Sequence, residues 1–328
     1  MQERTLGHTG RTVGAIGLGA WQLGADWGEV DEDQAFATLG AAVDAGVTFI
    51  DTADVYGDGR SERLIGAFLR TLPAEQGLTV ATKMGRRVPQ EPERYTLDNF
   101  REWTDRSREN LGVDTLDLVQ LHCPPSIVYS TDAVFDALDT LVQERRIASY
   151  GVSVETCAEA LTAIARPGVA TVQIIFNLLR LKPLDDVLPA AQKANVGLIA
   201  RVPLASGLLS GRYDEHTTFA ADDHRNYNRH GEAFDVGETF SGVDYGTGLE
   251  VVRRLAALVP NGATMAQFAL RWILDHPAVS VIIPGARNPA QARLNVEAAH
   301  LAPLTAETHE QIAAIYDELV RPTVHDRW

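Results

Sequence analysis

Four polar residues stand at or just beyond the ends of successive apolar segments of this chain. Asp51 closes one segment and Tyr56 follows five residues later, while Lys83 and His122 close the next two. Taken singly, each has a structural explanation, such as a helix-capping Asp or a hydrogen-bonded core His. In a barrel of parallel strands, however, the carboxyl ends of the strands share the face on which active sites are built. Together the four residues therefore indicate one site.

These residue types can deliver a proton to a carbonyl oxygen. The ammonium of Lys83 would lower the pKa of Tyr56 from its usual value of about 10 by favouring the phenolate. Ionised Asp51 would keep Lys83 protonated in a partly dry site. His122 can donate a hydrogen bond to the carbonyl oxygen while Tyr56 protonates it. Because no side chain stores a hydride, a redox cofactor must supply it.

An alternative chemistry uses Lys83 as a Schiff-base nucleophile on an unrelated barrel. That role requires Lys83 to be free of Asp51, and it leaves Tyr56 without a function.

Short apolar runs alternate with helical patterns along the chain. A hairpin is expected over residues 5–14, and the following strands at 15–19, 47–50, 78–83, 116–121, 148–152, 171–176, 196–201 and 280–283. Helices are expected at 32–45, 61–71, 98–111, 132–144, 155–165 and 184–194. Asp98 and Asp132 occupy expected N-cap positions, and Gly46 and Gly112 follow helix ends.

Eight strands separated by helices favour an α/β fold that closes into a (β/α)₈ TIM barrel, with an N-terminal β-hairpin and long barrel-mouth loops. We expect residues 1–328 to form a single domain. A doubly wound open sheet is the alternative, but the nearest glycine motif, at 14–19, has the wrong spacing for a dinucleotide fingerprint. The long polar segment 213–248 is either a lid over the site or a surface insertion.

The composition restricts the partners and the compartment. The chain has 29 Lys and Arg against 44 Asp and Glu, a net charge of −15, which disfavours nucleic acid and anionic membranes. Cys123 and Cys157 form neither a disulfide framework nor a metal-ligand spacing. There is no signal peptide, no apolar run of 18 residues and no lipidation motif. We expect a cytoplasmic protein that binds no membrane, and the sequence carries no indication of its oligomeric state.

The chain resembles the aldo-keto reductases over essentially its full length. The resemblance rests on the run from Asp44 to Gly57 with Ser61-Glu62 after it, and on the segments 81–83, 121–122 and 283–287. It implies that Asp51, Tyr56, Lys83 and His122 are the catalytic tetrad. The implied reaction is the reduction of a small aldehyde or ketone by NADPH, without a metal. Trp21, Tyr56 and His122 would contact the substrate.

The resemblance also implies where the nicotinamide lies. Trp21 and Asp51 would lie beneath it, and Ser153 and Gln173 would hold its carboxamide. Val154 replaces the Asn that usually follows this Ser. Arg201 stands where many relatives place an aromatic residue that stacks on the nicotinamide. A planar guanidinium can lie on that ring, where it would repel the oxidised cofactor and speed its release; alternatively, Arg201 points to the pyrophosphate or to a loop carboxylate.

The rest of the cofactor is expected to follow two segments. The loop under the pyrophosphate would comprise Pro203, Leu204, Ser206, Gly207, Leu209 and Arg212. After the eighth strand, Arg287 would bind the adenosine 2′-phosphate, with Gln291 and Asn295 near the adenine. Gly285-Ala286 replaces the usual Lys-Ser pair. One strong phosphate ligand then remains, so some tolerance of NADH is expected.

Substrate choice in this family comes from loops over the barrel mouth, here Trp21–Trp27, Cys123–Tyr129 and 213–248. Within the last, Arg225, Tyr227, Arg229 and His230 either recognise a polar or acidic carbonyl compound or form a solvated loop face. The main alternative to an enzyme is a non-catalytic or slow redox sensor, a regulatory subunit on the same barrel. The intact tetrad argues against a loss of chemistry, and it is compatible with a slow enzyme used as a redox sensor.

Overall fold

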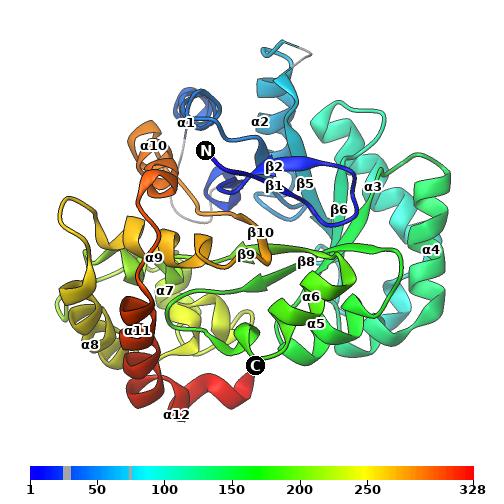
Figure 1. The fold of residues 1–328 in the computed structure, drawn as a ribbon. Coiled ribbons are helices and arrows are strands. Elements are labelled where there is room, and N and C mark those ends of the chain that lie inside the picture. The colour runs from blue at the N-terminus through cyan, green and yellow to red at the C-terminus, as the bar shows by residue number, and fades with distance from the viewer. Residues whose placement is uncertain (25–30, 74–75) are drawn as a thin grey trace.

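A cylinder of eight parallel strands forms the centre of the structure, which is a computed structural model describing residues 1–24, 31–73 and 76–328 (Figure 1). The strands follow one another in chain order around the sheet. They are β3 Leu18–Gly19, β4 Phe49–Asp51, β5 Thr79–Met84, β6 Leu118–His122, β7 Tyr150–Ser153, β8 Val169–Ile175, β9 Gly197–Arg201 and β10 Val279–Ile282. All eight predicted barrel strands are thus confirmed, with ends that differ by up to three residues.

The first and last strands close the cylinder. Ile16 forms a parallel bridge with Ile282, and Gly19 forms another with Gly285. Gly17 lies in this seam, where a Cβ would stand 2.8 Å from the carbonyl oxygen of Phe49, so only glycine fits. Closure confirms the predicted (β/α)₈ barrel and excludes the doubly wound sheet.

The predicted N-terminal hairpin covers the end of the barrel at which the strands begin. Its strands, β1 Glu3–Thr5 and β2 Thr12–Gly14, pair antiparallel. Leu6 and Val13 from the hairpin are fully buried against residues that fill the barrel interior, among them Phe49, Leu118 and Ile199. The Oγ of Ser280 also donates a hydrogen bond to the carbonyl of Thr5. The opposite end, where the strands finish, remains for the site.

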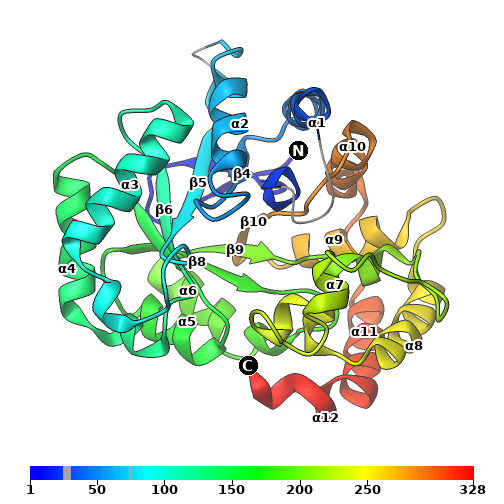
Figure 2. The ribbon, with the colours of Figure 1, turned by 180° about the vertical axis from the view of Figure 1, so that it is seen from behind.

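Helices surround the sheet on its outer side (Figures 1 and 2). They are α1 Glu32–Asp44, α2 Arg60–Leu69, α3 Leu97–Leu111, α4 Asp132–Gln143, α5 Cys157–Ile164, α6 Val187–Ala194, α7 His224–Tyr227, α8 Tyr245–Leu255, α9 Met265–Leu274, α10 Pro289–Glu297, α11 Ala306–Leu319 and α12 Arg321–Val324. The N-cap predictions were wrong by one or two residues. Thr96 caps α3 by accepting from the backbone of Asn99, and Thr131 occupies the N-cap position of α4, so Asp98 and Asp132 lie inside the first turns.

The segment 213–248 is more ordered than a lid or a surface insertion requires. It contains the short helix α7, two turns of 3₁₀ helix, η7 Val236–Glu238 and η8 Phe240–Gly242, and the first turn of α8. Asn228, Phe240 and Ser241 are almost completely buried. Part of the segment is therefore packed into the body of the protein.

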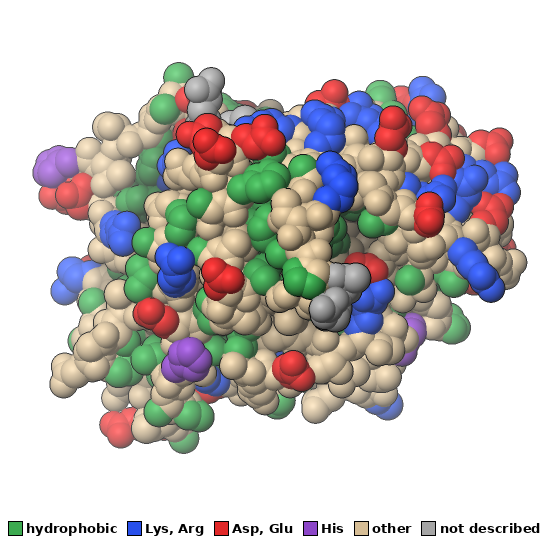
Figure 3. All heavy atoms as spheres, turned by 90° about the horizontal axis from the view of Figure 1, so that it is seen from above, with side chains coloured by type: hydrophobic (Ala, Val, Ile, Leu, Met, Phe, Trp, Pro, Cys, Tyr) green, Lys and Arg blue, Asp and Glu red, His purple; other side chains and the backbone are tan. Residues whose placement is uncertain are grey.

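Within the described parts of the chain, no helix is long and apolar enough to cross a bilayer, and no group of three His, Cys, Asp or Glu residues is arranged to hold a metal ion. Cys123 and Cys157 are both free thiols. On the face in Figure 3, basic and acidic side chains are interspersed. Oppositely charged side chains also pair between neighbouring helices, as Arg101 of α3 does with Glu144 just after α4.

Candidate active site

The strand register brings the four predicted catalytic residues to one end of the barrel. Asp51 is the last residue of β4, Lys83 the penultimate residue of β5 and His122 the last residue of β6. Tyr56 lies in the turn between β4 and α2. That turn packs closely on its neighbours, because Gly57 has a φ of 58° and a Cβ there would stand 2.2 Å from the carbonyl oxygen of Gly24.

The ammonium of Lys83 is the centre of the group. Its Nζ lies 2.5 Å from Oδ1 of Asp51, 2.8 Å from the carbonyl oxygen of Thr52 and 3.3 Å from the hydroxyl of Tyr56. Lys83 and Asp51 are each about 2% exposed or less. The donor geometry of an ammonium is thus satisfied by a carboxylate, a carbonyl and a phenol.

Two glutamines hold the second oxygen of Asp51. Gln173 of β8 donates to Oδ2 over 2.7 Å and Gln120 of β6 donates over 3.3 Å. Gln173 was expected to hold a nicotinamide carboxamide, but its Nε2 is engaged beneath the tetrad. Gln120 was not predicted, although a polar residue within the apolar run 118–121 was a signal for it. Both amides fix the orientation of the carboxylate and leave Oδ1 to Lys83.

Burial and charge together set the proton affinities of the pair. Burial is the largest single influence on Lys83 and lowers its pKa, but the attraction and hydrogen bonds of Asp51 and Tyr56 together outweigh burial and raise the pKa above its usual value. Burial raises the pKa of Tyr56, and the nearby Lys83 only partly offsets this. The net direction for Tyr56 is opposite to our expectation. The reason is that burial of the phenolate raises the pKa by more than the neighbouring ammonium lowers it.

His122 faces this group in a neutral state. Burial, followed by the charges of Arg86, Lys83 and Arg201, holds the pKa of His122 well below its usual range. Its Nδ1 is buried and has no hydrogen-bond partner among the described residues. The rings of Tyr56 and His122 meet edge to face with centroids 6.0 Å apart. A neutral imidazole keeps one N–H donor for an incoming oxygen.

Aromatic side chains form a wall beside Tyr56. Trp21 is the first residue of η1 Trp21–Gly24 and stacks on Tyr56, with centroids 6.0 Å apart and planes 19° apart. His224 and Phe234, from the segment 213–248, contact Trp21 from the other side. Only residues 21–24 of the predicted mouth loop Trp21–Trp27 are described; residues 25–27 lie outside the described part of the chain. The tetrad is thus bordered by the first barrel segment and by 213–248.

Arg201 of β9 points to carboxylates. Its guanidinium lies 2.8 Å from Glu155 and 2.5 Å from Glu238, and it donates to the carbonyl oxygen of Val154 over 3.0 Å. Glu238 belongs to the segment 213–248, so this geometry matches the expectation of a loop carboxylate. Ser153, next to Val154, is 1% exposed and ends β7.

Arg86 extends this contact into a closed set of alternating charges. It lies 3.0 Å from Glu155 and 4.0 Å from Glu238. We call Arg86, Glu155, Arg201 and Glu238 the ion ring. Its members follow β5, follow β7, end β9 and lie in η7, so the ring joins three barrel strands to the segment 213–248. None of the pairings except that of Arg201 with a loop carboxylate was foreseen from the sequence.

The loop expected under the pyrophosphate has unusual backbone angles. Val202, Ala205 and Ser206 have φ between 46° and 55°, and Gly207 has a φ of 89°. Leu204, with a φ of −105°, is followed by the left-handed Ala205, and such a right-handed–left-handed pair can build a concave backbone site for an anion. The loop continues into η6 Ala205–Ser210, and its predicted members differ in exposure: Arg212 is exposed, Leu204 half-buried, and Pro203 and Leu209 buried.

The segment after β10 folds against the start of α10. Arg287 is exposed one residue before the N-cap Asn288, and Pro289 is the first helical residue. Gln291 accepts from the backbone N–H of Arg287, and Asn295 donates to the carbonyl of Gly285. These two amides therefore brace the turn from which Arg287 extends. Gly285 is in close contact with the side chain of Gln22, where a Cβ would overlap.

The polar residues proposed from segment 213–248 are partly used by the fold. Arg225 is ion-paired with Asp223 and bonds to the hydroxyl of Tyr213, while Tyr227 is exposed and His230 lies at the surface. Arg229 donates to the carbonyl of Arg225. The arrangement favours the structural interpretation for Arg225.

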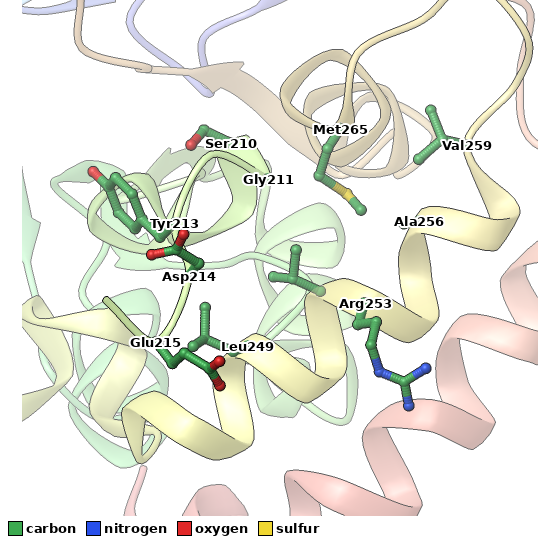
Figure 4. A pocket seen from close by; sticks show the side chains of 11 residues that line it. Ser210, Gly211, Tyr213, Asp214, Glu215, Leu249, Arg253, Ala256, Val259 and Met265 are labelled. Atoms are coloured by element: carbon green, nitrogen blue, oxygen red, sulfur yellow. The ribbon is translucent and has the colours of Figure 1, made fainter. Parts of the chain in front are cut away.

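A separate hollow lies outside the tetrad (Figure 4). It has a volume of about 580 Å³ and is formed by the end of η6, the segment after it, α8 and the start of α9. It is lined by Ser210, Gly211, Tyr213, Asp214, Glu215, Leu249, Val252, Arg253, Ala256, Val259 and Met265. None of the four catalytic candidates lines it.

Comparison with known proteins agrees with this geometry. Aldo-keto reductase YhdN from Bacillus subtilis is 30% identical over 296 residues, covering 89% of this chain and 86% of that protein. An aldo-keto reductase from Klebsiella pneumoniae in complex with NADPH superposes with a TM-score of 0.71 at 26% identity, over 96% of both chains. A probable voltage-gated potassium channel subunit beta from Arabidopsis thaliana is 28% identical over 93% of both chains. The profile of the aldo/keto reductase family matches residues 15–317, and the chain belongs to that family.

Proposed function

We propose that this protein reduces an aldehyde or ketone to the alcohol with NADPH, and that Tyr56 is the proton donor. The observation that carries the proposal is the buried contact of Lys83 with both Asp51 and Tyr56, beside a neutral His122. A non-catalytic barrel does not need a buried ammonium held next to a phenol, whereas a slow enzyme used as a redox sensor would share it. The same contact opposes the Schiff-base alternative, because Lys83 is tied to Asp51.

Each residue of the group has a distinct part in the proposed reaction. His122 donates a hydrogen bond to the carbonyl oxygen and fixes its place. NADPH, when bound, supplies the hydride to the carbonyl carbon. As negative charge develops on the oxygen, Tyr56 transfers its proton there, and Lys83 stabilises the phenolate that remains. The raised pKa of Tyr56 keeps the proton in place until that moment. Water then restores the proton.

The residues present fit the cofactor. The concave backbone after β9 suits a pyrophosphate, and the exposed Arg287 at the start of α10 suits the 2′-phosphate that distinguishes NADPH. Trp21 and Ser153 would face the nicotinamide, and the carbonyl of Val154, next to Ser153, is bonded to Arg201. The Klebsiella relative holds NADPH on the same fold.

The Tyr56→Phe variant tests the proposal. NADPH oxidation with a panel of aldehydes is expected to fall by about 10²- to 10⁴-fold, the usual contribution of a general acid. The dissociation constant for NADPH, measured by fluorescence titration, should change little, because only a hydroxyl is removed. Undiminished turnover would contradict the role of Tyr56. If the wild-type protein binds NADPH but oxidises it only at background rate with every carbonyl compound, the sensor alternative gains support.

A further inference from the structure

Trp328 packs against the loop that carries Glu238. It is 8% exposed, and its indole lies where side chains on two flanking glycines would stand. A Cβ on Gly237 would lie 3.0 Å from Cη2 of the indole, and a Cβ on Gly242 would lie 3.0 Å from Cζ2. The carbonyl oxygen of Trp328 also accepts from the backbone N–H of Cys157 at the start of α5. Trp328 thus joins the start of α5, through its backbone carbonyl, to η7–η8, through its ring.

Arg180 connects the same indole to the other acidic member of the ion ring. Its guanidinium carbon lies 3.8 Å from the centroid of the Trp328 ring, a cation–π contact at a residue only 1% exposed. Arg180 donates to the carbonyl oxygen of Glu155, and a Cβ on Gly237 would lie 2.4 Å from its Nη1. Trp328 therefore buttresses the backbone of both Glu155 and Glu238, each of which pairs with Arg201.

The consequence concerns the charge next to Ser153 and Val154. Arg201 bonds to the Val154 carbonyl, and its positive charge is offset there by Glu155 at 2.8 Å and Glu238 at 2.5 Å. On the proposed function, this is the nicotinamide end of the site. The oxidised nicotinamide carries a positive charge and the reduced ring does not, so a less well compensated Arg201 would disfavour NADP⁺ in particular.

We propose that Trp328 is a positioning residue for the nicotinamide end of the site, acting through Glu238 and Glu155 on Arg201. By holding both carboxylates against the guanidinium, it keeps the local charge low and lets NADP⁺ bind. This inference rests on the proposed use of NADPH.

The test compares Trp328→Ala with Arg327→Ala, a control that removes an exposed neighbouring side chain. In Trp328→Ala, the ratio of the dissociation constants of NADP⁺ and NADPH should rise about three- to tenfold, from partial loss of one compensating charge. Glu238→Gln should raise the same ratio. Since both changes act on the pairing of Glu238 with Arg201, the effect of the double variant should be smaller than the sum of the two single effects. Trp328→Leu keeps apolar bulk without the aromatic face and carries the same prediction if the alanine variant does not fold.

A second measurement needs no nucleotide. Backbone amides in 236–243 should exchange hydrogen faster in Trp328→Ala than in Arg327→Ala. An equal rise of both dissociation constants, additive effects in the double variant or unchanged exchange would overturn the proposal. If the wild-type protein binds both nucleotides and the ratio does not move, this inference alone fails. If it binds neither, the proposed function fails and the inference fails with it.

Discussion

The Asp51→Asn substitution removes the charge that stabilises the buried ammonium of Lys83. Nζ of Lys83 lies 2.5 Å from Oδ1 of Asp51, and both side chains are at most 3% exposed. Removing one partner of a buried ion pair typically costs about 3–5 kcal/mol, because the other charge remains buried without compensation. Asn has nearly the same shape as Asp, so the loss reports charge and not packing. The contacts of Lys83 with Thr52 and Tyr56 remain in the variant and reduce the loss of stability.

The pH dependence of this loss can be worked out from the same pair. Without Asp51 the variant can fold with a neutral Lys83, at a cost of about 1.4 kcal/mol for each pH unit below the usual pKa of about 10.5. That route costs about 6 kcal/mol at pH 6 but only about 2 kcal/mol at pH 9. In the wild-type protein the raised pKa of Lys83 contributes stability that is complete below pH 10.5 and is lost above it. The variant's loss should therefore be larger at pH 6 than at pH 9.

Urea unfolding at the two pH values measures this effect, and NADPH oxidation at pH 9, where a neutral Lys83 costs less than an uncompensated charge, measures its catalytic side. A neutral Lys83 no longer stabilises the phenolate of Tyr56, so turnover should fall by about 10²-fold or more. Asp54→Asn is the comparison variant, since burial raises the pKa of Asp54 to about 8 and this substitution should add stability where Asp51→Asn removes it. A loss below about 1 kcal/mol at pH 6, or equal losses at both pH values, would refute the account of the Lys83 pair.

Two further results are expected. Because the pKa of Asp54 is raised from 3.8 to about 8, chiefly by burial and by Glu62, its contribution to stability is complete below about pH 4 and is lost as the pH rises toward 8. Asp54→Asn should therefore gain stability relative to the wild-type protein by a few kcal/mol between pH 5 and pH 8 in urea unfolding, and a constant difference would contradict this. Arg287→Ala should raise the dissociation constant of NADPH about tenfold or more and leave that of NADH nearly unchanged; equal effects on both would remove Arg287 from the 2′-phosphate.

The sequence was sufficient for the tetrad because that arrangement depends on strand register. Asp51, Lys83 and His122 finish or nearly finish neighbouring parallel strands, and such positions must meet in any barrel of this topology. Gln120 could also have been predicted, since it interrupts an apolar strand with a polar side chain that has to find a partner inside the barrel. The pKa direction of Tyr56 could not, because it depends on how much water the fold removes.

The pairings of the ion ring could not be predicted from the sequence, for a different reason. Its members are separated by 37 to 152 positions in the chain, and no spacing rule relates a residue in the segment 213–248 to the end of β9. A guanidinium at the end of β9 has too few local neighbours to show whether it would stack on a ring or pair with an acid. The fold decides between these by placing Glu155 and Glu238 on either side of Arg201.

The tetrad and the ion ring are held by different parts of the fold, and this difference has a chemical consequence. Asp51, Lys83 and His122, which would support the proton transfer from Tyr56, are held by strands, and the register of the strands cannot slip without exposing the core. The charge beside the proposed nicotinamide is held instead by a carboxylate in a connecting segment and by an indole behind it. Substitutions near Gly237, Glu238 and Trp328 should therefore alter the preference between oxidised and reduced cofactor while leaving the contact of Lys83 with Tyr56 intact. Cofactor preference and proton transfer can then change independently in this fold.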